Sequence, residues 1–391
     1  MTSATTERRD KSAISYSYDG ELKKALEIAE AYGFKIIPPL KIESEERAFA
    51  EEYNCPEHHI ASLRHADERL QQFPEDVVRI AHTRKVPYKN KLELRLEIIG
   101  DKESSAEGLL FQTARAILEE YGHHEPTVTI NSVGGKESVG PFSQAVTQHF
   151  RGHLANLHPD CRTSFKKSVF APFRCSHKEC MEARAEAPHS LNFLTEQSKQ
   201  HFTEVLEYLE SFDLPYTVNP HMVGNEHYTT RTLFVFDVPT KKRSDDEEES
   251  THIAWGERYD SLSKKIGMKK ITPAVNLTLD LQTKSTKEAF KERQRHPVIS
   301  IHVVHAGRPA KMRVLKLAEI LRGSQIRASM QLHKNSITEQ LERAKVTGAP
   351  LLLIVGQKEV LDGTVMVRQT ATSCQESIPV TRLVGYLKAH L

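Results

Sequence analysis

Hydrophobic patterning changes character near residue 297, and this change limits the folds open to the chain. Before that point, strand-like stretches follow one another over long connections, and helical patterns gather elsewhere. "LELRLEIIG" and "TTRTLFVFDV" alternate apolar and polar residues, "TVTINSVG" and "PAVNLTLDL" are further strand-like pieces, and "SAEGLLFQTARAILEEYG" has helical spacing. Strands in succession with segregated helices are typical of an antiparallel α+β core.

After residue 297, strand and helix patterns alternate regularly. "VISIHVV", "IRASMQL" and "PLLLIVG" are separated by helical stretches, which predicts a small α/β domain with a largely parallel sheet. We therefore expect a disordered lead over 1–15 and a core over 16–295 that includes a mostly helical insertion at 136–193. A second domain is expected over 297–391.

The net charge of the whole chain does not indicate a particular binding partner, but the charge is unevenly distributed. Lys and Arg number 54 against 52 Asp and Glu in 391 residues, a net charge of +2. Residues 297–391 carry 13 basic and 6 acidic side chains, so their net charge of +7 leaves −5 for the rest. A basic small domain beside an acidic large one is a hint of an anionic partner.

The sequence also indicates the compartment. It has no run of about 18 apolar residues that would predict a membrane span, and its polar N-terminus lacks the apolar region of a signal peptide. Its five cysteines, an odd number, fit free thiols in a reducing compartment better than a disulfide framework. We expect a soluble, cytoplasmic protein.

Two short motifs have some features of a phosphate-binding loop and of a metal site. "SVGGKES" lacks the spacing of a P-loop. Cys175, His177 and Cys180 lie close together in "CSHKEC", with Cys161 and His158 upstream. A structural zinc site normally takes four ligands in paired short spacings, and this cluster has the number without that pattern. We therefore interpret its cysteines as free thiols in a turn between helices and expect no metal.

A longer constellation runs through most of the chain. "YLESFDLPYTVNPHMVGNEHYTTRTLFVF" followed by "WGERYDSL" resembles the histidyl-tRNA synthetase family of class II aminoacyl-tRNA synthetases. Similar stretches lie upstream, in "EIIGDKESSAEGLLFQTARAILEEYG", and downstream, in "LAEILRGSQIRASMQL" and "LLLIVGQKEVLDGTVMV". The resemblance begins near Leu22, and order and spacing agree throughout. It implies a class II antiparallel core that forms a homodimer, and a C-terminal α/β anticodon-binding domain.

The resemblance also implies a histidine–tRNA ligase that uses ATP and Mg²⁺, yet this sequence departs from the family's motifs. The family's R-G-L-D-Y-Y element begins at Gly224, which replaces the arginine that meets the carboxylate and phosphate charges. His227 replaces the aspartate, whereas Tyr228 and Arg231 match. Loss of a preorganised cation at a developing charge typically costs orders of magnitude in rate.

The ATP-binding motifs of the class are similarly changed. Motif 2 aligns on "VRIA", with Arg79 at the arginine that holds the α-phosphate and Ala81 in place of a glutamate. In motif 3, Asp280 replaces a glycine and Thr283 replaces the arginine that stacks on adenine. The family's L-R-P-E-G-T segment is at best echoed by "LRHADE", with Ala66 opposite its glutamate.

The "GERYD" motif is well kept, although a buried arginine–aspartate pair can hold a sheet without binding a ligand. The remnants of the substrate and ATP pocket are therefore Arg79, Tyr228, Arg231, Arg258, Tyr259 and Asp260. No catalytic residue is assigned.

The second domain supplies candidates for RNA binding. A basic helix start can hold phosphate through side chains and backbone N–H groups. Exposed aromatic residues would favour base stacking, but Tyr386 is the domain's only aromatic residue. The candidate phosphate-binding residues are Arg308, Lys311, Arg313, Lys316, Arg322 and Arg327.

The main hypothesis is a synthetase-like protein that has lost aminoacylation and binds tRNA or another RNA, or acts in regulation. Two alternatives stay open. One is an active histidine–tRNA ligase with a rebuilt ATP site. The other is a histidine-sensing regulatory subunit that binds another enzyme.

Overall fold

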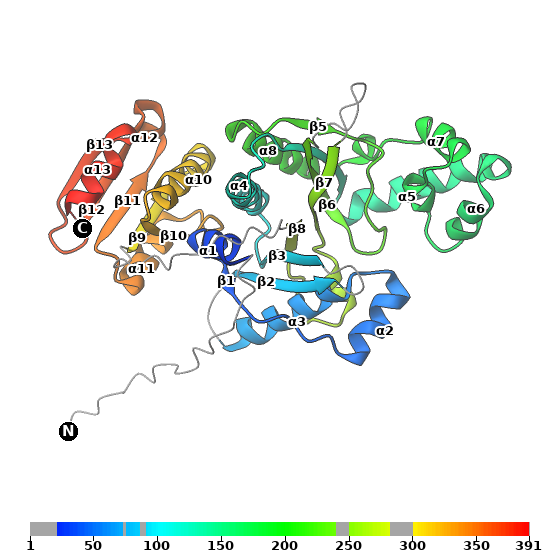
Figure 1. The fold of residues 1–391 in the computed structure, drawn as a ribbon, viewed down its shortest axis with the longest axis horizontal. Helices are drawn as coiled ribbons and strands as arrows, with labels where there is room; N and C mark the ends of the chain where they lie inside the picture. Colours follow the sequence, from blue (N-terminus) through cyan, green and yellow to red (C-terminus); the bar gives the residue numbers. More distant parts are fainter. Residues whose placement is uncertain (1–21, 73–75, 87–90, 240–249, 282–299, 391) are drawn as a thin grey trace.

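The computed structural model describes residues 22–72, 76–86, 91–239, 250–281 and 300–390 (Figure 1). It confirms the expected α+β class, a core dominated by one antiparallel sheet with a smaller α/β domain beside it. The predicted disordered lead and Thr283 lie outside the described residues. None of the helices within the described ranges is long and apolar enough to cross a membrane.

The larger sheet has eight described strands in the order β1-β2-β3-β8-β7-β6-β4-β5. Its neighbours are antiparallel except for the two edge pairs, β1 with β2 and β4 with β5. The strands are β1 Lys35–Ile36, β2 Val78–Val86, β3 Lys91–Ile99, β4 Thr127–Gly134, β5 Tyr216–Val218, β6 Thr230–Pro239, β7 Ser250–Arg258 and β8 Ala274–Asp280.

Helices cover both faces of this sheet, and the alternation of β3 shows how its two faces are divided. Leu94, Leu96 and Ile98 pack into the main core with α1 (Lys23–Ala31), α4 (Ser105–Glu120) and α8 (Glu196–Ser211). The opposite face packs against α2 (Ser44–Tyr53), α3 (Glu57–Gln72) and α9 (Leu262–Lys265) (Figure 1). Because side chains alternate along a strand, Glu93, Arg95 and Glu97 point to this second face.

The segment between β4 and α8 is helical wherever elements are assigned in it. Its own core is built around Phe142, Phe150 and Phe173, and Figure 1 shows it at the end of the molecule remote from the C-terminal domain. Its elements are α5 Lys136–Gly152, η1 Leu154–Asn156, α6 Pro159–Phe165, η2 Ala171–Arg174, α7 Lys178–Ala185 and η3 Ser190–Phe193.

The C-terminal domain has a sheet of five described strands in the order β10-β9-β11-β12-β13. The expectation of a largely parallel sheet is only half right, because β12 is antiparallel to both of its neighbours. The connections on either side of β12 are too short for a parallel crossover, which needs a dozen or more residues. The elements are β9 Ser300–His305, α10 Arg308–Gly323, β10 Arg327–Met330, α11 Ile337–Thr347, β11 Leu351–Val355, α12 Gln357–Asp362, β12 Thr364–Gln369, β13 Gln375–Pro379 and α13 Val380–His390.

Candidate functional site

The face of the sheet beneath α2 and α3 carries two of the residues that match the family's substrate motifs. Tyr228 and Tyr259 are 6% and 0% exposed there. The Tyr259 hydroxyl donates to Glu97 on β3, and Ser62 of α3 donates to the other oxygen of Glu97 at 2.7 Å. Glu97 is fully buried, and this opposes its ionisation, but nearby His82 and His59 outweigh burial and lower its pKa.

A histidine of the chain itself completes this buried cluster. The ring of His59, in α3, stacks on Tyr259 with centroids 4.2 Å apart and planes at 17°. Its Nε2 lies 3.5 Å from Oε1 of Glu257, whose other oxygen accepts a 2.5 Å hydrogen bond from Thr229. His59 is 2% exposed. The carboxylates and hydroxyls of this face are therefore bonded to one another and to α3.

The loop that aligns with the R-G-L-D-Y-Y element has no room for the family's arginine. A Cβ atom added to Gly224 would lie 2.2 Å from Oγ1 of Thr229, far inside van der Waals contact. Thr229 is held in that place because its hydroxyl accepts from the backbone N–H of Asn225 at 2.7 Å and donates to Glu257. The packing thus agrees with the glycine at this position.

Arg258 faces the opposite side of the sheet from Tyr259. Its guanidinium is 0% exposed and makes two hydrogen bonds to Glu107 of α4, at 2.8 and 2.6 Å. Asp260 lies 3.3 Å from Arg258 and 3.6 Å from Arg231. The structure therefore brings these three charged residues together, but as part of the packing between sheet and helix. This geometry fits the interpretation of "GERYD" in which the arginine–aspartate pair holds the sheet without binding a ligand.

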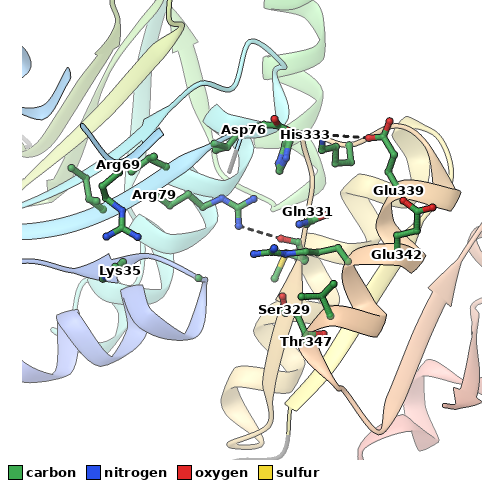
Figure 2. A pocket seen from close by; sticks show the side chains of 18 residues that line it. Lys35, Arg69, Asp76, Arg79, Ser329, Gln331, His333, Glu339, Glu342 and Thr347 are labelled. Atoms are coloured by element: carbon green, nitrogen blue, oxygen red, sulfur yellow. Dashed lines mark hydrogen bonds and ion pairs between the residues drawn. The ribbon is translucent and has the colours of Figure 1, made fainter. Parts of the chain in front are cut away.

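The structure does not bring Arg79 to the other remnants. Because β2 pairs Ile80 with Glu97, Ile80 shares the substrate-motif face and Arg79 points the other way. Arg79 instead lines a cleft of about 510 Å³ between the core and the C-terminal domain (Figure 2). There it donates to the carbonyl of Met330 at 3.2 Å, near His333. The predicted place of Arg79 beside Tyr228 and Tyr259 therefore differs from the described structure, in which it lies on the other face of the sheet.

Further polar side chains line this cleft from both domains. Figure 2 shows Arg79 and Lys35 on the core side of the cleft, and Gln331, Glu339 and Glu342 on the side of the C-terminal domain. Lys334 is paired with Asp76 and lies 3.3 Å from Glu339, so its charge is already balanced. The cleft is mixed in charge rather than a strongly basic surface.

Most of the predicted RNA-binding cations of α10 and β10 are engaged within the chain. Arg308 lies 3.3 Å from Glu204 and 2.9 Å from Glu207 of α8, and Arg327 lies 2.9 Å from Glu30 of α1. Both guanidinium groups are therefore ion-paired with the core, although each stays partly exposed.

The remaining four candidates differ in exposure. Lys311 is buried, and burial lowers its pKa. Arg322 pairs with Glu319 at 2.6 Å, and Arg313 donates to a carbonyl of α12 at 3.3 Å. Lys316 is the exposed one of these four in the described structure, and Arg308 and Arg327 are exposed as well although they are ion-paired.

Sequence reasoning missed the buried cluster of Ser62, His59 and Glu97. Glu97 lies in "LELRLEIIG", and its charge between apolar residues of this strand was the available signal. The echo of L-R-P-E-G-T was also misplaced, because "LRHADE" lies inside α3 and its Ala66 is buried.

The interpretation of the cysteines as turn residues was wrong for two of the three. Cys161 lies in α6 and Cys180 in α7, both buried, while Cys175 follows η2. One ligand atom from each of the three lies within 4.8 Å of the others.

Comparison with known proteins agrees with this architecture. Residues 299–390 match the anticodon binding domain family. The chain is 27% identical over 302 residues to a histidine–tRNA ligase of Rippkaea orientalis, covering 76% of this chain and 69% of that protein. It is 26% identical over 298 residues to the corresponding ligase of Clostridium perfringens, covering 75% and 69%. Its fold is similar to the apo structure of S. aureus histidyl-tRNA synthetase, with a TM-score of 0.52, 22% identity and 94% of each chain covered. The chain is thus similar in sequence to histidine–tRNA ligases and in fold to a histidyl-tRNA synthetase, and its C-terminal domain matches the anticodon binding domain family.

Proposed function

We propose that this protein binds RNA through its anticodon-binding-type domain and does not activate histidine. The observation that carries the proposal is the buried cluster of His59, Glu97 and Tyr259 on the sheet face that matches the family's substrate motifs. A substrate on this face would have to displace α3 and break the hydrogen bonds from Ser62 and Tyr259 to a buried carboxylate. Leaving such a group unsatisfied costs about 1–3 kcal/mol or more.

The missing cations support the same conclusion. Adenylation needs preorganised positive charge around the α-phosphate, because the transition state concentrates negative charge there. Gly224 supplies none, and Arg79 lies on the far face of the sheet. Asp280, at the end of β8, sits opposite Glu93 of β3, so the nearby strand ends carry two carboxylates.

RNA binding is supported by the family of the C-terminal domain and by its net charge of +7. Since most of the candidate cations are paired with the core, we expect modest affinity with a small number of phosphate contacts. Lys316 is the candidate best placed to make one. A homodimer, formed through the core, is part of the proposal and is checked by light scattering.

The proposal is tested by two assays on the full chain. Histidine-dependent exchange of pyrophosphate into ATP should stay at the level of a blank, with an active histidine–tRNA ligase as the positive control. Exchange well above the blank would restore the ligase alternative. Histidine binding by calorimetry without exchange would favour the histidine-sensing alternative.

The RNA half is measured separately, by fluorescence anisotropy with labelled tRNA at increasing salt. Lys316→Glu should weaken binding and reduce the slope of log K against log salt by about 1. Lys178→Glu is the matched control, because Lys178 is exposed on α7, at the end of the molecule remote from the C-terminal domain. Absence of affinity at low salt would end this half of the proposal.

A further inference from the structure

Three cysteines from consecutive short elements meet in the helical segment between β4 and α8. Cys161 lies in α6, Cys175 directly after η2, and Cys180 in the first turn of α7. Their ligand atoms all lie within 4.8 Å of one another. Cys161 and Cys180 are 8% and 0% exposed, whereas Cys175 is half-buried. The three thiols therefore form one compact group at the edge of the local core.

The spacing of the sulfur atoms suits a metal better than a disulfide. Zn–S bonds of about 2.3 Å in a tetrahedron place sulfurs about 3.8 Å apart, so a closure of about 1 Å at most is needed. A disulfide needs about 2.05 Å between two sulfurs and would leave the third thiol alone. All five cysteines of the chain are free in the structure.

Two of the three sulfurs accept hydrogen bonds from backbone N–H groups. The backbone N–H of His158 donates to Sγ of Cys180 at 3.3 Å, and the backbone N–H of His177 donates to Sγ of Cys175 at 3.4 Å. Hydrogen bonds of this kind to ligand atoms accompany protein metal sites.

An imidazole nitrogen lies beside one of the three thiols. Nδ1 of His177 is 3.0 Å from Sγ of Cys175, which is close to the edge of a mixed sulfur–nitrogen tetrahedron. The ring of His158 stacks on His177 at 3.6 Å and 8°, and it orients the imidazole. His158 is itself engaged, because its Nδ1 accepts from the backbone N–H of Asp160 at 3.3 Å.

We propose that Cys161, Cys175, Cys180 and His177 bind one structural Zn²⁺ ion. Three thiolates and one imidazole form a closed, tetrahedral set that zinc prefers, and four protein ligands leave no open position for chemistry. The ion ties α6, η2 and α7 together. These elements have 7, 4 and 8 residues, too short to be stable as isolated helices.

The first test measures zinc in the full chain purified without chelators. Elemental analysis should give about one zinc per chain. After removal of zinc, titration with Co²⁺ should produce the intense visible bands of a tetrahedral cobalt–thiolate site, and stoichiometric Zn²⁺ should abolish them. This spectroscopic readout does not depend on RNA binding or on pyrophosphate exchange. The zinc site can therefore be confirmed or refuted independently of the proposed function.

Variants then assign the ligands. Cys175→Ser and Cys180→Ser should lose most of the bound zinc, whereas Cys55→Ser and Cys374→Ser should keep it, because those two cysteines lie outside the group. His177→Ala should change the cobalt spectrum more than His158→Ala. If a variant fails to fold, the cobalt titration of the unmodified chain still decides the question.

Two outcomes would overturn the site. One is a purified chain without zinc that gives no cobalt bands and titrates as five free thiols under denaturing conditions. The other is a titration of three thiols instead of five, because that result identifies a disulfide within the group.

Discussion

Replacement of Arg258 by Met should destabilise the protein strongly without removing any surface that a ligand could use. The guanidinium is 0% exposed, bonds twice to Glu107, and donates to the carbonyls of Asp101 and Glu103 at 2.8 and 3.3 Å. Removing it leaves the buried carboxylate of Glu107 with hydrogen bonds to His201 and Thr232, at 3.0 and 2.6 Å. Loss of one partner of a buried pair costs about 3–5 kcal/mol.

The pH dependence of this loss distinguishes a buried charge pair from simple packing. Burial by itself would raise the pKa of Glu107, but Arg258 and His201 outweigh burial and hold that pKa well below its usual range. In the unmodified chain, the stabilisation from Glu107 is thus present above about pH 4.5 and is lost as the pH falls. Without Arg258, burial raises the pKa above its unfolded value, so the variant loses stability as the pH rises through it.

The deficit of the Arg258→Met variant should therefore be larger at pH 8 than at pH 5. Urea unfolding followed by circular dichroism measures the free energy of unfolding at both values. Adding Glu107→Gln should recover part of the loss, because the stranded charge is removed. Lys199→Met is the control, since its pair with Glu196 at 2.7 Å is exposed and worth about 1 kcal/mol or less. A deficit below about 1 kcal/mol, or one equal at both pH values, would refute the reasoning.

Three further predictions concern stability and its pH dependence. Gly224→Ala should cost about 1–3 kcal/mol in urea unfolding, because its Cβ would clash, whereas Gly140→Ala, with nothing within 4 Å of its Cβ, should be neutral or stabilising. A loss of the same size at both glycines would contradict the steric argument. Burial lowers the pKa of His302 and of His305 to about 4, so both should stay neutral in the fold, and stability should fall as the pH drops from 6.5 towards 4, which thermal unfolding at pH 7 and pH 4.5 can measure. His302→Gln should flatten this slope, and an unchanged slope would show that His302 does not contribute to it. Arg308→Ala should cost less than about 1 kcal/mol in urea, because its guanidinium is 42% exposed and its ion pairs are screened by solvent, and a larger loss would mean that these pairs hold the domains together.

Local patterns predicted the elements of the core well, but not the direction of every side chain. The alternation of Leu94, Leu96 and Ile98 identified β3, and these residues do form the face that packs against α1, α4 and α8. The face to which Arg79 points depends on how β2 pairs with β3, and a shift of one residue in register moves every side chain to the other face. A gapless alignment carries no information about that pairing.

The sequence by itself determined the similarity to the synthetase family, the α+β core, the succession of strands and the loss of the family's arginine at Gly224, because these depend on local periodicity and on residue identity at aligned positions. Tertiary structure alone decided that His59 stacks on Tyr259, that Arg308 and Arg327 face acidic residues of the core, and that three cysteines meet. The first two kinds of contact join side chains from elements far apart in the chain, and the cysteines come from three consecutive short elements. Their meeting is set by the packing of helices on the sheet, and no short-range pattern encodes it.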